Sequence, residues 1–367
     1  MRTRTNLFRQ SEYSGGSPTY ERPRDWLALP YPERGTQALH FLVAVFDGIS
    51  NRIAFSAAGA YTVDWGDGSA AEDIASGTTA EHEYLYSELP DTSYCVRGYR
   101  QALVQVTPQA GQNLTAFDFQ KKHTNGPTGY EARNILDVNA RLPNCTTFNL
   151  GGVVGTEYRL SLLERFWVYG TWSVTVYSSL FASSQRVLSY SLPTTGVTAI
   201  NYMLSGVERH YSAVSYASST NAQSMFQSAR AAVVSATLPE ATNASYFCFS
   251  SAFVKKLYIH APKATTIQSI CESCRNLKSI TGNLSAATTT TDAFKNCSTL
   301  ETFLVTGMKA SFNLATTNLN AAAFAAAGAL MADGTGQTVT ISSALDATLS
   351  AEQRAVWTDK NWTIAAV

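Results

Sequence analysis

The sequence predicts a mainly β protein with some α-helix, in which a small N-terminal β-sandwich is followed by a solenoid of stacked repeats. Three observations predict this fold: short strand-like segments separated by turns in residues 39–110, a repeat in residues 187–304, and a change of pattern after residue 310. At 367 residues, the chain is longer than one ordinary domain needs. Two modules are therefore expected.

The repeat is marked by a column of residues in which each follows the last by 23 positions: Leu188, Tyr211, Val234 and Leu257. A fixed period of about 20–29 residues with one short apolar strand per unit is typical of a solenoid, because a single unit cannot bury its own apolar side. Since side chains alternate between the faces of a strand, Leu257 is expected inside, and Tyr258 and His260 outside.

After a shift of frame, the column continues with Leu277 and Leu300, and counting from Leu300 places Phe303 on the outward face. Aromatic and charged outward side chains therefore gather in the C-terminal coils, and Tyr258, His260 and Phe303 are the predicted partner-binding residues of the solenoid. The residues expected to be buried and to head parallel strands of one sheet are Leu188, Val234, Leu257 and Leu300.

Three segments of the repeat region resemble the BspA-type leucine-rich repeat, which places an aromatic residue before Asn-Cys-Ser-x-Leu and a strand. They are FKNCSTLETFLVTG (294–307), ICESCRNLKSITGNL (270–284) and LPNCTTFNLGG (142–152). The resemblance implies a leucine-rich-repeat solenoid over residues 111–310. Residues 187–254 depart from the pattern, since Ala and Ser replace the Asn-Cys pair, and their assignment rests on the period alone.

The segment before the repeats reads as a sandwich, with several short strands and an Asp-Gly turn. The motif YTVDWGDGS, followed by HEY, resembles the PKD-type immunoglobulin-like domain and implies such a domain over residues 39–110, with a role in placement and display rather than catalysis. Asp64 and Asp67 could hold a cation, but carboxylates in such turns more often bond turn amides, which is the interpretation favoured here.

Residues 1–38 form an arm without a regular period, broken by glycine and proline. The arm is too rich in aromatic residues for a disordered tail, and aromatic and arginine side chains supply most interface hot spots. It is therefore expected to be an extended docking arm, and its candidate partner-binding residues are Arg22, Arg24, Trp26 and Tyr31. An arm folded back on its own domain is the alternative, and both can hold together.

Residues 311–367 are expected to cap the solenoid, because the last repeat has one face without a neighbour. The alanine-rich segment 314–331 indicates a helix, Ser350 opens a capping box with Gln353, and 337–342 and 360–364 read as strands. The terminal segment DKNWTIAAV resembles the end of BspA-like repeat proteins, especially those encoded by phages.

Composition excludes several functions. The net charge is +0 and only 15% of residues are charged, which argues against nucleic-acid binding. No apolar run spans a membrane, and Met1–Gln10 lacks the apolar core of a secretory signal, so folding in a cytosol with free thiols is expected. Cys271-x-x-Cys274 with Cys297 suggests zinc, but small residues at a coil corner explain these cysteines better; no metal or other cofactor is expected.

Catalysis is not expected either. Glycoside hydrolysis needs two carboxylates flanking a cleft, and the repeats supply acids thinly and without an obvious pair. Neither a nucleophile elbow nor a phosphate loop occurs. The loop at 121–133 could carry function or could be a tolerated insertion.

The combined resemblances imply a non-enzymatic virion protein of a tailed phage, assembled in the host cytoplasm. It would be a tail-fibre, baseplate or appendage component that anchors to other virion proteins through its N-terminal part. Its solenoid would bind a host surface glycan or protein. The sequence leaves open whether the chain forms a homo-oligomer. The alternatives are a capsid decoration or head-fibre protein and a bacterial cell-surface adhesin, which the missing secretory signal disfavours.

Overall fold

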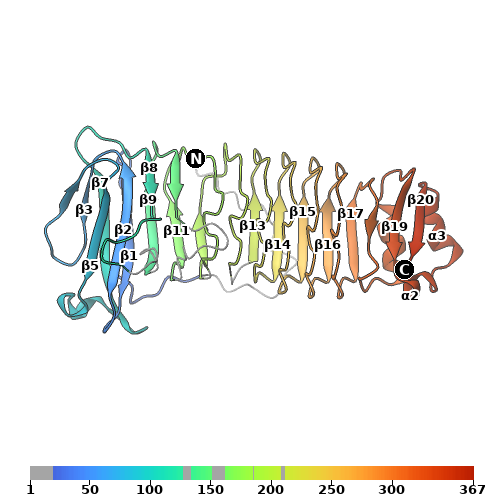
Figure 1. Cartoon of the computed structure of the whole chain (residues 1–367), viewed down its shortest axis with the longest axis horizontal. Coiled ribbons are helices and arrows are strands. Elements are labelled where there is room, and N and C mark those ends of the chain that lie inside the picture. The colour runs from blue at the N-terminus through green and yellow to red at the C-terminus, as the bar shows by residue number, and fades with distance from the viewer. Residues whose placement is uncertain (1–19, 127–133, 151–161, 185, 208–210) are drawn as a thin grey trace.

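The computed structural model describes residues 20–126, 134–150, 162–184, 186–207 and 211–367. The chain is mainly β, as predicted, and forms one elongated body in which the strands follow one another along the long axis (Figure 1). Within the described residues, no helix is long and apolar enough to cross a membrane.

Two sheets pack face to face at the N-terminal end. The first is eight-stranded, in the order β12-β11-β9-β1-β7-β3-β4 with β6 beside β7, and the second has the order β10-β8-β2-β5. Phe41 of the first sheet and Phe55 of the second meet edge to face at 5.7 Å in the shared core. The strands before residue 110 are β1 (Ala38–Val45), β2 (Asn51–Ala58), β3 (Tyr61–Asp64), β4 (Glu72–Ile74), β5 (Thr79–Tyr84), β6 (Tyr94–Cys95) and β7 (Tyr99–Pro108).

The Trp-Gly-Asp-Gly motif forms the turn between β3 and β4. Asp64 accepts a hydrogen bond from the Gly66 amide at 2.9 Å, and Asp67 accepts one from the Ser69 amide at 3.0 Å, so the expectation that these carboxylates bond turn amides is confirmed. Asp67 also meets Nε2 of His82, on β5, at 2.6 Å. The motif therefore fastens the turn of one sheet to a strand of the other.

Both sheets continue from the sandwich into the repeats. β9 pairs antiparallel with β1 and parallel with β11, and β8 pairs antiparallel with β2 and parallel with β10. One hydrophobic core runs from Leu39 to Trp362, so the boundary expected at residue 110 does not separate two cores. The strands of this junction are β8 (Ala116–Asp118), β9 (Ile135–Arg141), β10 (Thr147–Asn149), β11 (Arg165–Val168) and β12 (Ser189–Ser191).

A third sheet stacks five parallel strands along the middle of the molecule. They are β13 (Tyr211–Ser215), β14 (Val233–Thr237), β15 (Lys256–His260), β16 (Ser279–Asn283) and β17 (Thr302–Thr306). The predicted burial of Val234, Leu257 and Leu300 is confirmed, as is the parallel pairing. Leu188 is only half-buried, and it precedes β12, which pairs with β11 in the first sheet.

The predicted outward position of Phe303 is wrong. β17 pairs with β16 so that Phe303 lies beside Ile280, and Ile280 lies beside Leu257, which puts all three in one buried column. Leu300 belongs to a different column, because it precedes β17 in the turn. Counting from it shifted the alternation of β17 by one residue, and a one-residue shift exchanges the two faces of a strand.

A second ladder joins the coils away from the strands. Amides alternate here between two partners: Ala222 donates to the Asn243 carbonyl of the next coil at 2.9 Å, while Met225 donates to Ala222 within its own turn at 3.3 Å. The alternation needs left-handed backbone at two positions four residues apart in a coil, and Ser224 and Ser228 adopt φ of 53° and 55°. Because these residues are not glycine, the neighbouring coils must hold the conformation.

Exposed threonines add a further row of hydrogen bonds between coils. The Oγ1 of each donates to the carbonyl of the threonine one coil earlier, at 3.1 to 3.3 Å. These donors are Thr198, Thr220, Thr242, Thr265 and Thr288. The threonine-rich composition of the repeats therefore serves the stacking itself.

The C-terminal segment packs at the end of the stack (Figure 1). Trp357 stacks on Phe324 at 4.6 Å, and the capping box of Ser350 and Gln353 is present. The predicted first helix is shorter than 314–331. The elements are β18 (Phe312–Asn313), α1 (Ala321–Ala329), β19 (Gln337–Ile341), α2 (Ser343–Asp346), α3 (Ala351–Thr358) and β20 (Trp362–Ala366).

The corrected alternation of β17 is testable with two neighbouring substitutions. Phe303→Ala removes a fully buried ring and should lower the free energy of unfolding by about 3–5 kcal/mol. Leu304→Ala removes a side chain that is 37% exposed and should cost less than about 1.5 kcal/mol. Chemical denaturation measures both losses. A larger loss for Leu304→Ala would indicate that Leu304 is buried and Phe303 faces outward, as predicted from the sequence.

The Asp67 contact predicts a pH dependence of stability. Burial raises the pKa of Asp67, but hydrogen bonds from Ser69 and His82 outweigh it and hold the pKa below its usual value. A depressed pKa stabilises the fold above the carboxyl's unfolded pKa of about 4, and this contribution is lost as the pH falls through the folded pKa.

Asp67→Asn should therefore lower the free energy of unfolding by about 1–3 kcal/mol at pH 7, and the difference from wild type should shrink below about pH 4. Glu72→Gln, an exposed change on the same hairpin, should follow wild type at every pH. Thermal unfolding from pH 3 to 7 measures the difference. A gap for Asp67→Asn that stays constant over this range would contradict the role of the ionised carboxylate.

Candidate functional site

The described part of the arm, residues 20–38, lies against the outer face of the first sheet. Trp26 is only 4% exposed, packs with Leu42 and Leu136, and donates a hydrogen bond from Nε1 to the Tyr99 hydroxyl at 2.9 Å. Trp26 is therefore a core residue of its own domain and not a free docking residue, which corrects its predicted role. For these residues the arm is folded back, as in the alternative interpretation; residues 1–19 lie outside the described residues.

Arg22 also has its partners within the chain. Its Nε bonds Asp137 Oδ2 at 2.7 Å, and Asp137 Oδ1 accepts from Arg165 Nη1 at 2.8 Å. Asp137 is fully buried on β9, and burial raises its pKa while the two guanidinium groups oppose the rise. Sequence reasoning missed Asp137 because nothing in its segment links it to arginines far away in the chain.

Side chains of β9 hold the arm's main chain in place. Asn139 donates to the carbonyls of Leu29 and Pro30 at 3.3 and 2.9 Å, and Arg141 donates to that of Pro32 at 3.2 Å. The arm forms no strand here, so these side chains replace the ladder bonds its carbonyls would otherwise make. The path of the arm is therefore fixed where it crosses the sheet.

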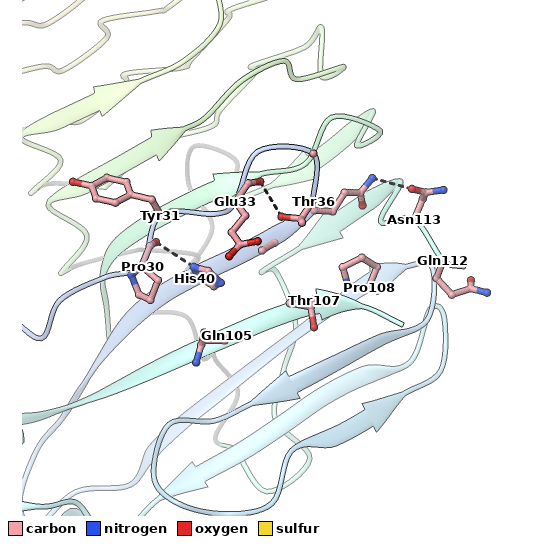
Figure 2. Close-up of a pocket in the computed structure, with 13 residues that line it drawn as sticks. Pro30, Tyr31, Glu33, Thr36, His40, Gln105, Thr107, Pro108, Gln112 and Asn113 are labelled. Atoms are coloured by element: carbon pink, nitrogen blue, oxygen red, sulfur yellow. Dashed lines mark hydrogen bonds between the residues drawn. The ribbon is translucent and has the colours of Figure 1, made fainter. Parts of the chain in front are cut away.

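Past this crossing, the arm borders a groove of about 660 Å³, which we call the arm groove (Figure 2). His40 lies in its wall, with Nδ1 3.1 Å from the Pro30 carbonyl, and burial lowers the His40 pKa. Gln37 fixes the far end through its bonds to Asn113 and to the Leu114 amide. The groove is lined by Pro30, Tyr31, Glu33, Gly35, Thr36, Gln37, Ala38, His40, Gln105, Thr107, Pro108, Gln112 and Asn113.

Tyr31 links the groove to a cluster of aromatic side chains. It is 72% exposed, and its ring meets Tyr169 edge to face at 5.4 Å. The Tyr169 ring lies 6.2 Å from that of Trp167, which is 37% exposed. We call Tyr31, Trp167 and Tyr169 the aromatic ledge. Of the arm's four predicted residues, Tyr31 and Arg24 are exposed, and only Tyr31 joins other candidates.

The outward face of β13–β17 presents fewer aromatic residues than predicted. Tyr258 is 37% exposed and His260 is half-buried, both on β15, whereas the buried Phe303 does not join them. The residues aligned with Tyr258 on the neighbouring strands are Ser235, which is buried, and Thr281, which is half-buried. The predicted C-terminal aromatic surface is therefore reduced to one strand. Part of the 121–133 loop, residues 127–133, lies outside the described residues.

The cysteines serve the core rather than chemistry. All six are buried and free, and Cys274 and Cys297 donate to the carbonyls of Cys248 and Cys271 at 2.9 and 3.0 Å. Burial raises the pKa of the Cys248, Cys271 and Cys297 thiols, which keeps them protonated and poorly nucleophilic. In the described part of the chain, no three His, Cys, Asp or Glu residues are grouped so that they could hold a metal ion.

Comparisons with known proteins do not indicate a function, so the function must be inferred from the residues of this chain. No protein-family model, curated protein or solved structure matches the sequence or the fold. The arm groove and the aromatic ledge remain as the candidate binding site.

The buried ion pair that fixes the arm can be tested against an exposed one. Asp137→Asn leaves Arg22 and Arg165 without a counter-charge and should lower the free energy of unfolding by about 3–5 kcal/mol. Glu240→Gln breaks the exposed pair with Lys263 and should cost less than about 1 kcal/mol. Urea denaturation compares the two variants; equal losses would show that the arm is not held by Asp137.

Proposed function

We propose that this protein is a non-enzymatic structural component of a tailed-phage virion, most simply a tail-fibre, baseplate or other appendage protein. The observation that carries the proposal is the single core running from the sandwich through the parallel stack to the C-terminal cap. A core of this kind makes a rigid rod, which suits an element that spans a distance within a particle. The phage setting rests on the motifs that resemble PKD-type and BspA-like segments.

We infer that the two parts are a PKD-type immunoglobulin-like sandwich and a BspA-like leucine-rich-repeat solenoid. The sandwich assignment is supported by the contact of Asp67 with His82, which gives the motif residues a common structural role. The solenoid assignment is supported by parallel strands one repeat apart, such as β14, β15 and β16. Because the Asn-Cys pair is missing from residues 187–254, the period carries the assignment there.

A structural role also fits the use of polar groups in the described chain. Asp137 is held by two arginines, the threonines bond the carbonyls of neighbouring coils, and the buried thiols are protonated. These groups stabilise the fold and are not free for proton transfer or nucleophilic attack. Anchoring would fall to the N-terminal part, where Arg24 remains exposed, and the solenoid would be displayed outward.

Immunoelectron microscopy tests the proposal directly. An antibody against residues 111–367 should label the tail, baseplate or another appendage of purified phage particles whose genome encodes the chain. Label confined to the capsid surface would favour the head-fibre or decoration role and reject the tail assignment. Label found on the bacterial surface and absent from particles would favour the adhesin and reject a virion role.

A further inference from the structure

We propose that the arm groove and the aromatic ledge together form a binding site for a neutral saccharide chain. The site differs from the surface predicted from the sequence, which lay on the C-terminal coils. It is built where the arm crosses the start of the repeats, from segments that are far apart in the sequence. The inference does not depend on whether the chain belongs to a virion.

The ledge supplies flat aromatic surfaces that are held in place. Trp167 donates from Nε1 to Ser189 Oγ at 3.2 Å, and the Arg165 guanidinium lies 5.0 Å from its ring centre. Arg165 is itself fixed by Asp137, so the Trp167 ring is oriented from the buried network below. A pyranose ring has one face formed largely of C–H groups, which packs on an aromatic ring, while its hydroxyls point outward to polar partners.

The groove supplies those polar partners. Gln105 and Gln112 each carry an amide that can donate and accept, which matches a sugar hydroxyl that does both. Asn113 adds an amide donor, since its Oδ1 already accepts from Gln37 and Asn144. Nδ1 of His40 faces the Pro30 carbonyl, which can only accept, so Nδ1 carries the proton and Nε2 is left as an acceptor. Thr107 adds a hydroxyl to the same lining.

The charge of the lining selects a neutral ligand. Among the described residues that line the groove, Glu33 is the one carboxylate and there is no lysine or arginine. Nucleic acids, phosphates and acidic sugars would meet this carboxylate with no cation in the described lining of the groove to compensate it. The Arg165 guanidinium beside Trp167 does not change this, because Asp137 and Asn139 already hold it.

The arrangement of the site favours a chain of several sugars over a single one. Tyr31 lines the groove, yet its ring packs on Tyr169 of the ledge. Figure 2 shows this ring pointing away from Gln112 and Asn113, which lie at the other end of the groove. A ligand that contacts both the ledge and the amides must therefore extend across the site.

The test uses the full chain and a glycan array of neutral and acidic bacterial oligosaccharides. We expect the protein to retain neutral oligosaccharides, and the best of them to be measured by titration calorimetry. Trp167→Ala and Tyr31→Ala should each weaken its binding by about tenfold or more, the effect of losing one aromatic stacking contact. Phe253→Ala removes a ring that is 51% exposed outside the site and should leave the affinity unchanged.

Melting temperatures separate a lost contact from a lost fold. Tyr31→Ala should melt within a few degrees of wild type, because its side chain is largely exposed. Gln105→Ala offers a second, polar variant and should weaken the same sugar. No retention of any neutral glycan would overturn the inference, and so would retention of acidic glycans alone or binding that neither Trp167→Ala nor Tyr31→Ala weakens. None of these results bears on where the protein sits in a particle.

Discussion

The hydrogen bonding of each coil to the next is the constraint on which the rest of the structure depends. A coil of 22 or 23 residues buries its apolar side chains only against its neighbours, and its amides find partners in them. Left-handed serines such as Ser224 and Ser228 would be unfavourable in an isolated coil, but here both neighbours hold them. The stack therefore forms as a cooperative unit, and both of its ends need closing.

The two ends are closed in different ways. At the N-terminal end the coils grow directly from the sandwich, since β8 and β9 each pair with a sandwich strand on one side and a coil strand on the other. At the C-terminal end, Trp357 and Trp362 cover the last coils, and Lys360 donates to three carbonyls near the end of α1. At the N-terminal end the sandwich and the coils share the same sheets, whereas at the C-terminal end additional helices and strands cover the last coil.

The period of the repeat could be predicted because it depends on equivalent residues at regular spacing, and Val234 and Leu257 take the places it assigns. The orientation of β17 could not be predicted from the sequence. Phe303, Leu304 and Val305 are all apolar, so the alternation of polar and apolar residues does not show which face is buried. Only pairing with β16 decides it. Alternation works where polar residues separate apolar ones, as in β15.

The position of Trp26 shows a signal that sequence reasoning did not use. β1 is apolar at nearly every position and buried on both faces, which indicates that something must cover the outer face of its sheet. Trp26 and Leu29 of the arm supply this cover. Asp137 and the aromatic ledge were beyond reach, because Tyr31 and Tyr169 are brought together only by the crossing of the arm over β9.

The coils stack at a regular spacing, so the number of coils sets the length of the stack. Adjacent strands in a sheet are about 4.8 Å apart, so each coil adds one such step between the arm groove and the C-terminal cap. Because the coils of β13–β17 meet their neighbours through the same parallel pairing, a unit gained or lost among them leaves both ends unchanged. Recombination between repeats could therefore tune the reach of this protein in fixed increments, independently of what either end binds.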